Sequence, residues 1–385
     1  MRLHWIDALK GIGIMLVVFA HHSLPVALDT YIFSFHMPLF FFISGFLFDF
    51  GKYAESTANF VKGRFRSLIV PYFCFALITC LFYFLLDTGF QPGVTNIEFF
   101  ETSALYGIYS ILYALGPLVS YNPPLWFLTC LFVTELLFYG FAKKYYGEPG
   151  KLVLWLTAAG IIGYLYSVYV PFRLPWNADV ALSAVAFYGA GNLFRKITEP
   201  DEKSGVASGT NVKANSSFNS ESRFRAGFSR TEKFFPGIFI LLNLLYFAYL
   251  LEFPTDKINM NVLKYGNFFS YYFLAFSGIF AFVYLFKKVG SSKILEYYGR
   301  NSLIVLALHF PLKDILTKLA IIAIGVELEC FYCKTALALS LTILNLLCLI
   351  PVIFLINNYF PFLLGKKGPF KELEGLKSRI RKLVN

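Results

Sequence analysis

The sequence predicts an all-α integral membrane protein with about ten transmembrane helices and both termini in the cytoplasm. Hydrophobic residues make up 57% of the 385-residue chain, and the mean hydropathy is +0.61. Only 15% of the residues are charged, whereas a soluble domain carries about 25%. Long apolar segments recur along the chain, and basic residues gather at their ends. The net charge of +11 therefore indicates membrane topology and not nucleic-acid binding.

Ten segments have the length and composition of a membrane-spanning helix, which needs about 20 predominantly apolar residues. No cleavage site of the A-x-A type follows the first segment, so we expect it to be retained as a helix. The predicted spans are 9–28, 31–50, 67–86, 125–142, 152–170, 178–196, 235–252, 267–286, 301–323 and 335–357.

The connecting segments alternate between rich and poor in Lys and Arg, which predicts their sides of the membrane. Residues 87–124 contain no Lys or Arg and are expected outside, whereas the basic segment 197–234 is expected in the cytoplasm. We predict one polytopic membrane domain over 1–365 and a basic cytoplasmic tail over 366–385. Residues 201–232 are rich in Ser, Gly and Asn and predict a disordered cytoplasmic loop.

The first predicted helix, with the residues just before its span, carries Asp7, Lys10 and His21 on one helical stripe. Lys10 and His21 are eleven positions apart, which corresponds to about three turns and about 16 Å along the axis. Ionisable residues inside a membrane segment are costly and indicate a functional site. The alternatives are that Asp7 and Lys10 are interfacial charges that extend toward water, and that His21 is a structural histidine.

Further polar residues fall within other predicted spans. His36 and Ser44 lie in the second span, where Ser44 and Gly45 are also typical of close helix packing. His309 lies in the ninth span at a depth similar to that of His21, so the two histidines are expected to share a cavity. We consider His36, His309 and Ser44 as supporting residues of a site around His21.

Glu135 lies deep in the fourth span, and it either orients a histidine or forms an ion pair with Lys10 or an arginine. A basic cluster of Lys62, Arg64 and Arg66 precedes the third span. This cluster is a topology signal, and it also suits the phosphates of a nucleotide ligand such as coenzyme A.

Trp176, Asn177 and Asp179 lie at the predicted external end of the sixth span. An aromatic ring with amide and carboxylate groups suits a sugar acceptor, although tryptophan is also ordinary at a membrane interface. Cys330 and Cys333 form a close pair, but no second pair or nearby histidine accompanies them, so no metal is expected.

Six stretches resemble the membrane acyltransferase-3 family in the family's own order: RLHWIDALKGIGIMLVVFAHH, FHMPLFFFISGFL, RFRSLIVPYF, PPLWFLTCLFVTELLF, RLPWNADVALSAVAFYGAGNLFRK and IVLALHFPL. The resemblance implies a multi-pass enzyme of the bacterial cell membrane that moves an acetyl or other short acyl group from acyl-CoA, typically acetyl-CoA. The implied acceptor is a hydroxyl of a cell-surface polysaccharide or of its lipid-linked sugar precursor.

The resemblance also assigns roles to residues. Lys10 and His21 fall on the family's motif of a basic residue, ten intervening residues and a histidine, with Lys where Arg is commoner. His21 is then the general base or a transient acyl carrier, with Asp7 and Lys10 on the same stripe of the helix. Arg64 and Arg66 are two positions apart, which departs from the family's Arg-x-x-Arg element.

Two other functions remain open at this point. A polytopic transporter or flippase for a lipid-linked glycan would also use buried histidines and a basic cytoplasmic face. A glycan polymerase is less favoured because the external loops are poor in arginine. The sequence predicts contact with the lipid bilayer and leaves the oligomeric state open.

Overall fold

The computed structural model describes residues 3–22, 24–53, 56–87, 104–115, 121–145, 147–198, 235–290, 292–324 and 335–366. These residues form helices with short connections and one isolated β-bridge between Asn259 and Lys264. The α-helices are α1 (His4–Ala20), α2 (Val26–Leu47), α3 (Thr57–Arg64), α4 (Val70–Asp87), α5 (Ala104–Tyr113), α6 (Trp126–Lys144), α7 (Pro149–Tyr169), α8 (Ala178–Thr198), α10 (Phe235–Glu252), α11 (Phe268–Val289), α12 (Lys293–Arg300), α13 (Ser302–Ile324) and α15 (Thr335–Tyr359). The predictions for 201–232, for Cys330 and Cys333 and for the tail after residue 366 lie outside the described residues.

Each predicted span overlaps a long helix, and a π-helical turn (Phe65–Ile69) joins α3 and α4 into one continuous helical stretch. Six helical stretches in the described part of the chain are long and apolar enough to cross a membrane: Val26–Leu47, Thr57–Phe84, Pro123–Lys144, Pro149–Tyr169, Phe268–Val289 and Thr335–Tyr359. The helical, multi-pass membrane architecture is therefore confirmed, whereas the count of ten spans and the orientation of the termini stay predictions.

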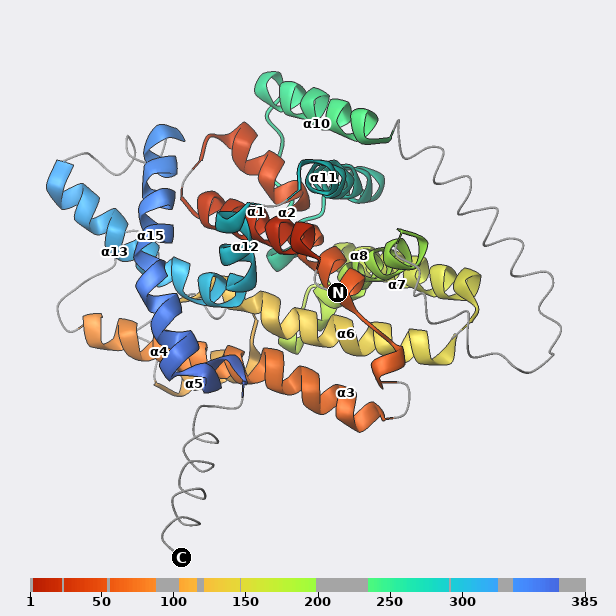
Figure 1. Cartoon of the computed structure of the whole chain (residues 1–385), viewed down its shortest axis with the longest axis horizontal. Coiled ribbons are helices and arrows are strands. Elements are labelled where there is room, and N and C mark those ends of the chain that lie inside the picture. The colour runs from red at the N-terminus through yellow and green to blue at the C-terminus, as the bar shows by residue number, and fades with distance from the viewer. Residues whose placement is uncertain are drawn as a thin grey trace, which may run out of the picture.

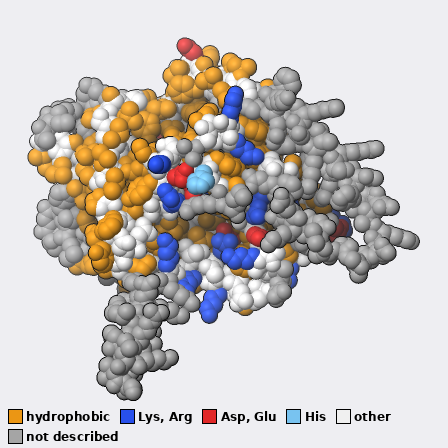
Figure 2. Space-filling model, in the orientation of Figure 1, with side chains coloured by type: hydrophobic (Ala, Val, Ile, Leu, Met, Phe, Trp, Pro, Cys, Tyr) orange, Lys and Arg blue, Asp and Glu red, His pale blue; other side chains and the backbone are white. Residues whose placement is uncertain are grey.

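Apolar side chains cover wide areas of the molecular surface. Leu154 of α7, Leu244 of α10 and Leu347 of α15 are each more than half exposed. A continuous apolar exterior on helices whose backbone groups are satisfied internally is the surface that lipid requires. Figure 2 shows broad hydrophobic areas and, nearer the middle of this face, a gathering of basic side chains.

The first helix differs from the predicted span 9–28, because α1 ends at Ala20 and α2 begins only at Val26. Pro25 disfavours helical conformation at the preceding residue, which explains the break. His21 is consequently the C-cap of α1 and not an interior residue of a continuous span.

Helices α1 and α2 lie at the centre of the bundle, with α10 and α11 on one side and α3, α4 and α6 on the other (Figure 1). Helix α1 packs against α12, and α2 packs against α8. Both interfaces depend on glycine, since a Cβ at Gly11 would collide with the Leu295 carbonyl and a Cβ at Gly45 with the Tyr188 carbonyl. The packing role of Gly45 is therefore confirmed.

Segments predicted on the same side of the membrane interact with one another. Among the predicted external segments, Lys257 pairs with Asp29, and Arg173 donates to the Asn261 carbonyl. Among the predicted cytoplasmic segments, Lys143 donates to the Thr57 hydroxyl at 2.9 Å. These contacts agree with the predicted alternation of the loops.

Candidate active site

His21 and His309 meet inside the bundle although 288 residues separate them in the chain. The distance from Nδ1 of His21 to Nε2 of His309 is 3.3 Å, and the ring centroids are 5.0 Å apart in an edge-on arrangement. His21 comes from the end of α1, and His309 comes from the first half of α13, where it is fully buried. The two histidines are therefore in contact, as their similar predicted depths suggest, but His309 lies behind His21 and lines neither cavity, so the expectation of a shared cavity is not met.

Backbone carbonyls fix the tautomer of both rings. Nδ1 of His21 lies 2.7 Å from the Val17 carbonyl oxygen, and Nδ1 of His309 lies 2.9 Å from that of Val305. A carbonyl oxygen only accepts hydrogen bonds, so each neutral ring must carry its proton on Nδ1. His309 Nε2 then carries a lone pair and accepts a hydrogen bond from His21 Nδ1–H. Nε2 of His21 is left unprotonated and can act as a base.

His21 lines a cavity of about 230 Å³ together with polar and aromatic side chains. His36 of α2 lies in the same wall, and its Nδ1 donates to the Ile32 carbonyl at 2.8 Å, which leaves its Nε2 as an acceptor. Asn261 contributes a side-chain oxygen that is buried without a partner. The remaining lining residues are Val17, Phe33, Met37, Pro123, Pro124, Trp126, Asn259, Met260, Leu306 and Phe310. Such a mixture of rings, amides and imidazoles suits a molecule that carries hydroxyl groups.

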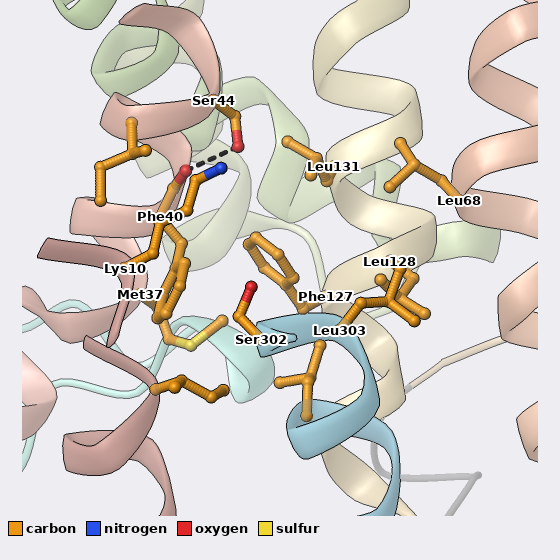
Figure 3. Close-up of a pocket in the computed structure, with 13 residues that line it drawn as sticks. Lys10, Met37, Phe40, Ser44, Leu68, Phe127, Leu128, Leu131, Ser302 and Leu303 are labelled. Carbon is orange, nitrogen blue, oxygen red and sulfur yellow. Dashed lines mark hydrogen bonds between the residues drawn. The ribbon is translucent and has the colours of Figure 1, made fainter. Parts of the chain in front are cut away.

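Lys10 lines a second cavity of about 150 Å³ on the same face of α1. In Figure 3 the Lys10 side chain runs along α2 and points toward Ser44, whose hydroxyl donates to the Phe40 carbonyl at 2.8 Å. Ser302 is the third polar residue in this lining, and the other ten are apolar. The predicted stripe from Lys10 to His21 therefore faces two cavities in succession.

The backbone of α13 around His309 is hydrogen-bonded by two asparagines, Asn122 and Asn345, that the sequence does not single out. Pro311 has no N–H, so the carbonyl of Ala307 loses its helical donor. Asn122 Nδ2 donates to this carbonyl at 2.8 Å, and Asn345 Nδ2 donates to the His309 carbonyl at 2.9 Å. A proline within a span signals a carbonyl that needs an external donor, but the sequence does not identify the donor.

The three residues of the basic cluster before the third span, Lys62, Arg64 and Arg66, have different surroundings in the structure. Arg64 forms an ion pair with the buried Glu135, with 3.1 Å between Nε and Oε2, and Tyr188 donates to the other carboxylate oxygen at 3.4 Å. Glu135 therefore pairs with an arginine, as one of the sequence-based alternatives held. Arg66 donates to the Gly365 carbonyl, and Lys62 is exposed.

The residues predicted to bind the acceptor sit in a separate turn and line neither cavity. Trp176 Nε1 donates to the Leu112 carbonyl at 3.0 Å, and Asn177 Nδ2 donates to that of Ala114 at 2.8 Å. Both carboxylate oxygens of the buried Asp179 accept from Arg173. These polar groups hold the end of α5 and the 253–267 loop, so their binding role stays a prediction.

Asp7 lies on α1 where its backbone carbonyl packs against Gly299, and its side chain lines neither of the two cavities. Among the described residues, no group of three or more His, Cys, Asp or Glu side chains is placed to hold a metal ion.

The fold and the paired histidines define a multi-pass membrane protein with a buried polar site in its helix bundle. A family described as "Acyltransferase domain", the acyltransferase-3 family, matches residues 3–364. The chain belongs to this family and is a membrane acyltransferase. No curated protein and no solved structure is similar enough to match it. The comparison gives no support to the transporter alternative.

Proposed function

We propose that this protein transfers an acetyl or other short acyl group from acyl-CoA to a hydroxyl of a cell-surface glycan or its lipid-linked precursor at the cell membrane. The observation that carries the proposal is the hydrogen bonding of His21, which determines which ring nitrogen holds the proton. Its Nδ1–H is held by Val17 and His309, and its Nε2 is the available base of a ring that lines a hydroxyl-compatible cavity.

His21 acts as the general base in this proposal. Nε2 takes the proton of the acceptor hydroxyl while the hydroxyl oxygen attacks the thioester carbonyl carbon. The carbon–sulfur bond then breaks, and the leaving thiolate of coenzyme A takes the proton from the imidazolium. General-base catalysis by a positioned histidine typically contributes about 10²–10⁴-fold.

Two features near His21 stabilise the imidazolium that forms during the reaction. His309 Nε2 and the Val17 carbonyl both accept from the same N–H. His21 also caps the C-terminus of α1, where the helix dipole favours a positive charge by about 0.3–1 kcal/mol. His309 thereby positions the base without touching the substrate.

The donor approaches through the Lys10 cavity, from the side that loop charges predict to be cytoplasmic. Its apolar walls suit the thioester arm, and Lys10 attracts the anionic part of coenzyme A. Lys62 and Arg66 lie on that side and are exposed, so they are available to the phosphates. Arg64 is instead engaged in its ion pair with Glu135.

The acceptor occupies the His21 cavity in this scheme. His36 and Asn261 offer hydrogen-bond acceptors to neighbouring hydroxyls, and Trp126 and Phe310 offer aromatic faces. Trp176, Asn177 and Asp179 do not line this cavity.

The test uses membranes from cells that produce the full chain, incubated with acetyl-CoA labelled in the acetyl group. Label should enter the glycan fraction as an alkali-labile ester, and the glycan mass should rise by one acetyl group. His21→Ala should lower incorporation by about 10²–10⁴-fold. His4→Ala is the matched control, because His4 pairs with Glu296 at the protein surface and lines neither cavity. Full incorporation in a normally produced His21→Ala protein would refute the role of His21, and no incorporation with wild type would refute the proposed reaction.

A further inference from the structure

The two cavities share only two lining residues, Met37 and Leu306. Met37 comes from α2 and Leu306 from α13, and both are more than nine-tenths buried. Along α1, Lys10 and Ile14 face the first cavity, and Val17 and His21 face the second. Met37 and Leu306 therefore form the partition between the two spaces.

The cavities differ in chemistry on either side of this partition. The Lys10 cavity is mostly apolar, as a thioester arm requires. The His21 cavity carries imidazole and amide groups, as an acceptor hydroxyl requires. A donor that enters from the Lys10 side must place its thioester carbonyl near His21, so its acyl group must pass between Met37 and Leu306.

We propose that Met37 and Leu306 form an aperture that determines which acyl groups reach His21. This inference rests on the proposed acyl transfer. Met37 has an unbranched, flexible thioether side chain that moves aside more readily than a branched one. Small acyl groups pass when it moves, whereas branched groups collide with Leu306. The aperture thus makes these two residues specificity determinants of the donor.

The experiment compares acetyl-, propionyl-, butyryl- and isobutyryl-CoA, each labelled in the acyl group, with membranes that contain wild type, Met37→Ala or Leu306→Ala. Wild type should transfer acetyl best and isobutyryl least. Each enlarging substitution should raise the ratio of isobutyryl to acetyl transfer by about tenfold or more, since one methylene in a fitted apolar pocket is worth roughly 10–200-fold. Met37→Phe should lower the same ratio.

Controls separate the aperture from general effects on folding. Met15→Ala removes a methionine from α1 that lines neither cavity, and its ratio should equal that of wild type. Met37→Val and Leu306→Val make smaller changes in case the alanine proteins are poorly produced, and rates are normalised to the amount of protein in the membrane.

The outcomes distinguish this inference from the proposed function. Acetyl transfer by wild type with unchanged ratios in the enlarged variants overturns the aperture and leaves acyl transfer standing. An equal change of the ratio in Met15→Ala also overturns it. No transfer of any acyl group by wild type overturns the proposed function and the aperture with it.

Discussion

Asn122 Nδ2 donates a hydrogen bond to the carbonyl oxygen of Ala307 across 2.8 Å, and both residues are completely buried. Pro311 leaves this oxygen without its helical donor. The contact therefore stabilises the proline-containing part of α13 close to His309. A loop residue from one part of the chain thus fixes the backbone that presents His309 from another.

Asn122→Ala should destabilise the protein and slow acyl transfer, because the Ala307 carbonyl would be buried without a donor. The expected cost is about 1–3 kcal/mol, measured as the shift of the thermal unfolding midpoint in detergent. Asn358→Ala is the control, since Asn358 is exposed and its Nδ2 bonds only within its own helix. Equal shifts in the two variants would contradict the role of Asn122.

His309→Ala should lower the kcat for acetyl transfer by about tenfold, which corresponds to the loss of one hydrogen bond of about 1.4 kcal/mol. The KM for acetyl-CoA should stay unchanged, because His309 positions His21 and does not line either cavity. His309→Gln retains an acceptor oxygen and should recover part of the rate. The role would be refuted by steady-state kinetics that show a raised KM with an unchanged kcat.

Lys10→Ala should weaken donor use by roughly 10–100-fold, the range expected for one charge-assisted contact. Lys10→Arg keeps the positive charge and should retain most of the activity. The measurement is kcat/KM for acetyl-CoA, with Lys151→Ala as the control, since the Lys151 side chain is exposed and pairs locally with Glu148. An active Lys10→Ala protein beside an inactive Lys10→Arg protein would mean that charge is not what Lys10 contributes.

Arg64→Ala should destabilise the protein by about 3–5 kcal/mol, because the buried Glu135 carboxylate would lose its counter-ion. Adding Glu135→Gln should restore much of that loss, since a neutral amide needs no counter-ion. Thermal unfolding of the single and double variants tests this. Arg66→Ala should have a smaller effect, because its partner is a surface carbonyl. If the double variant were no more stable than Arg64→Ala, the ion pair would not be the source of the stability.

Gly45→Ala should prevent normal folding or lower stability by about 1–3 kcal/mol or more, because its Cβ would collide with the backbone of α8. Gly140→Ala is the matched control, since a Cβ at this exposed helical glycine meets no atom within 4 Å. The yield of detergent-stable protein from membranes is the measurement. Similar yields of both variants would show that α2 and α8 tolerate a wider separation.

Hydropathy and charge alternation located the long helices, because the bilayer imposes a length on each apolar segment. The span 178–196, for example, corresponds to α8, Ala178–Thr198. The predicted first span, 9–28, extends past the end of α1 at Ala20, because apolar content alone does not show the effect of Pro25 on the helix. Sequence could also place His21 and His309 at similar depths, because depth follows from position within each span.

The sequence alone does not predict which residues contact one another in the folded protein. Asn177 resembles a sugar-binding residue in its chemistry, but its amide is used by the Ala114 carbonyl at 2.8 Å. The sequence does not single out Asn122 and Asn261, because nothing local in the chain indicates which carbonyl or cavity an asparagine will face. Arg64 likewise belongs to a basic cluster in the sequence, whereas in the structure it forms an ion pair with the buried carboxylate of Glu135.

The distance in sequence between His21 and His309 has a consequence for biosynthesis. A ribosome that adds about 5–20 residues per second needs roughly 15–60 s to make the 288 residues between them. Until then α1 also lacks α12, the helix that covers Gly11. In the proposed mechanism, the general base His21 therefore gains its positioning partner only after residue 309 has been translated and α13 has packed against α1.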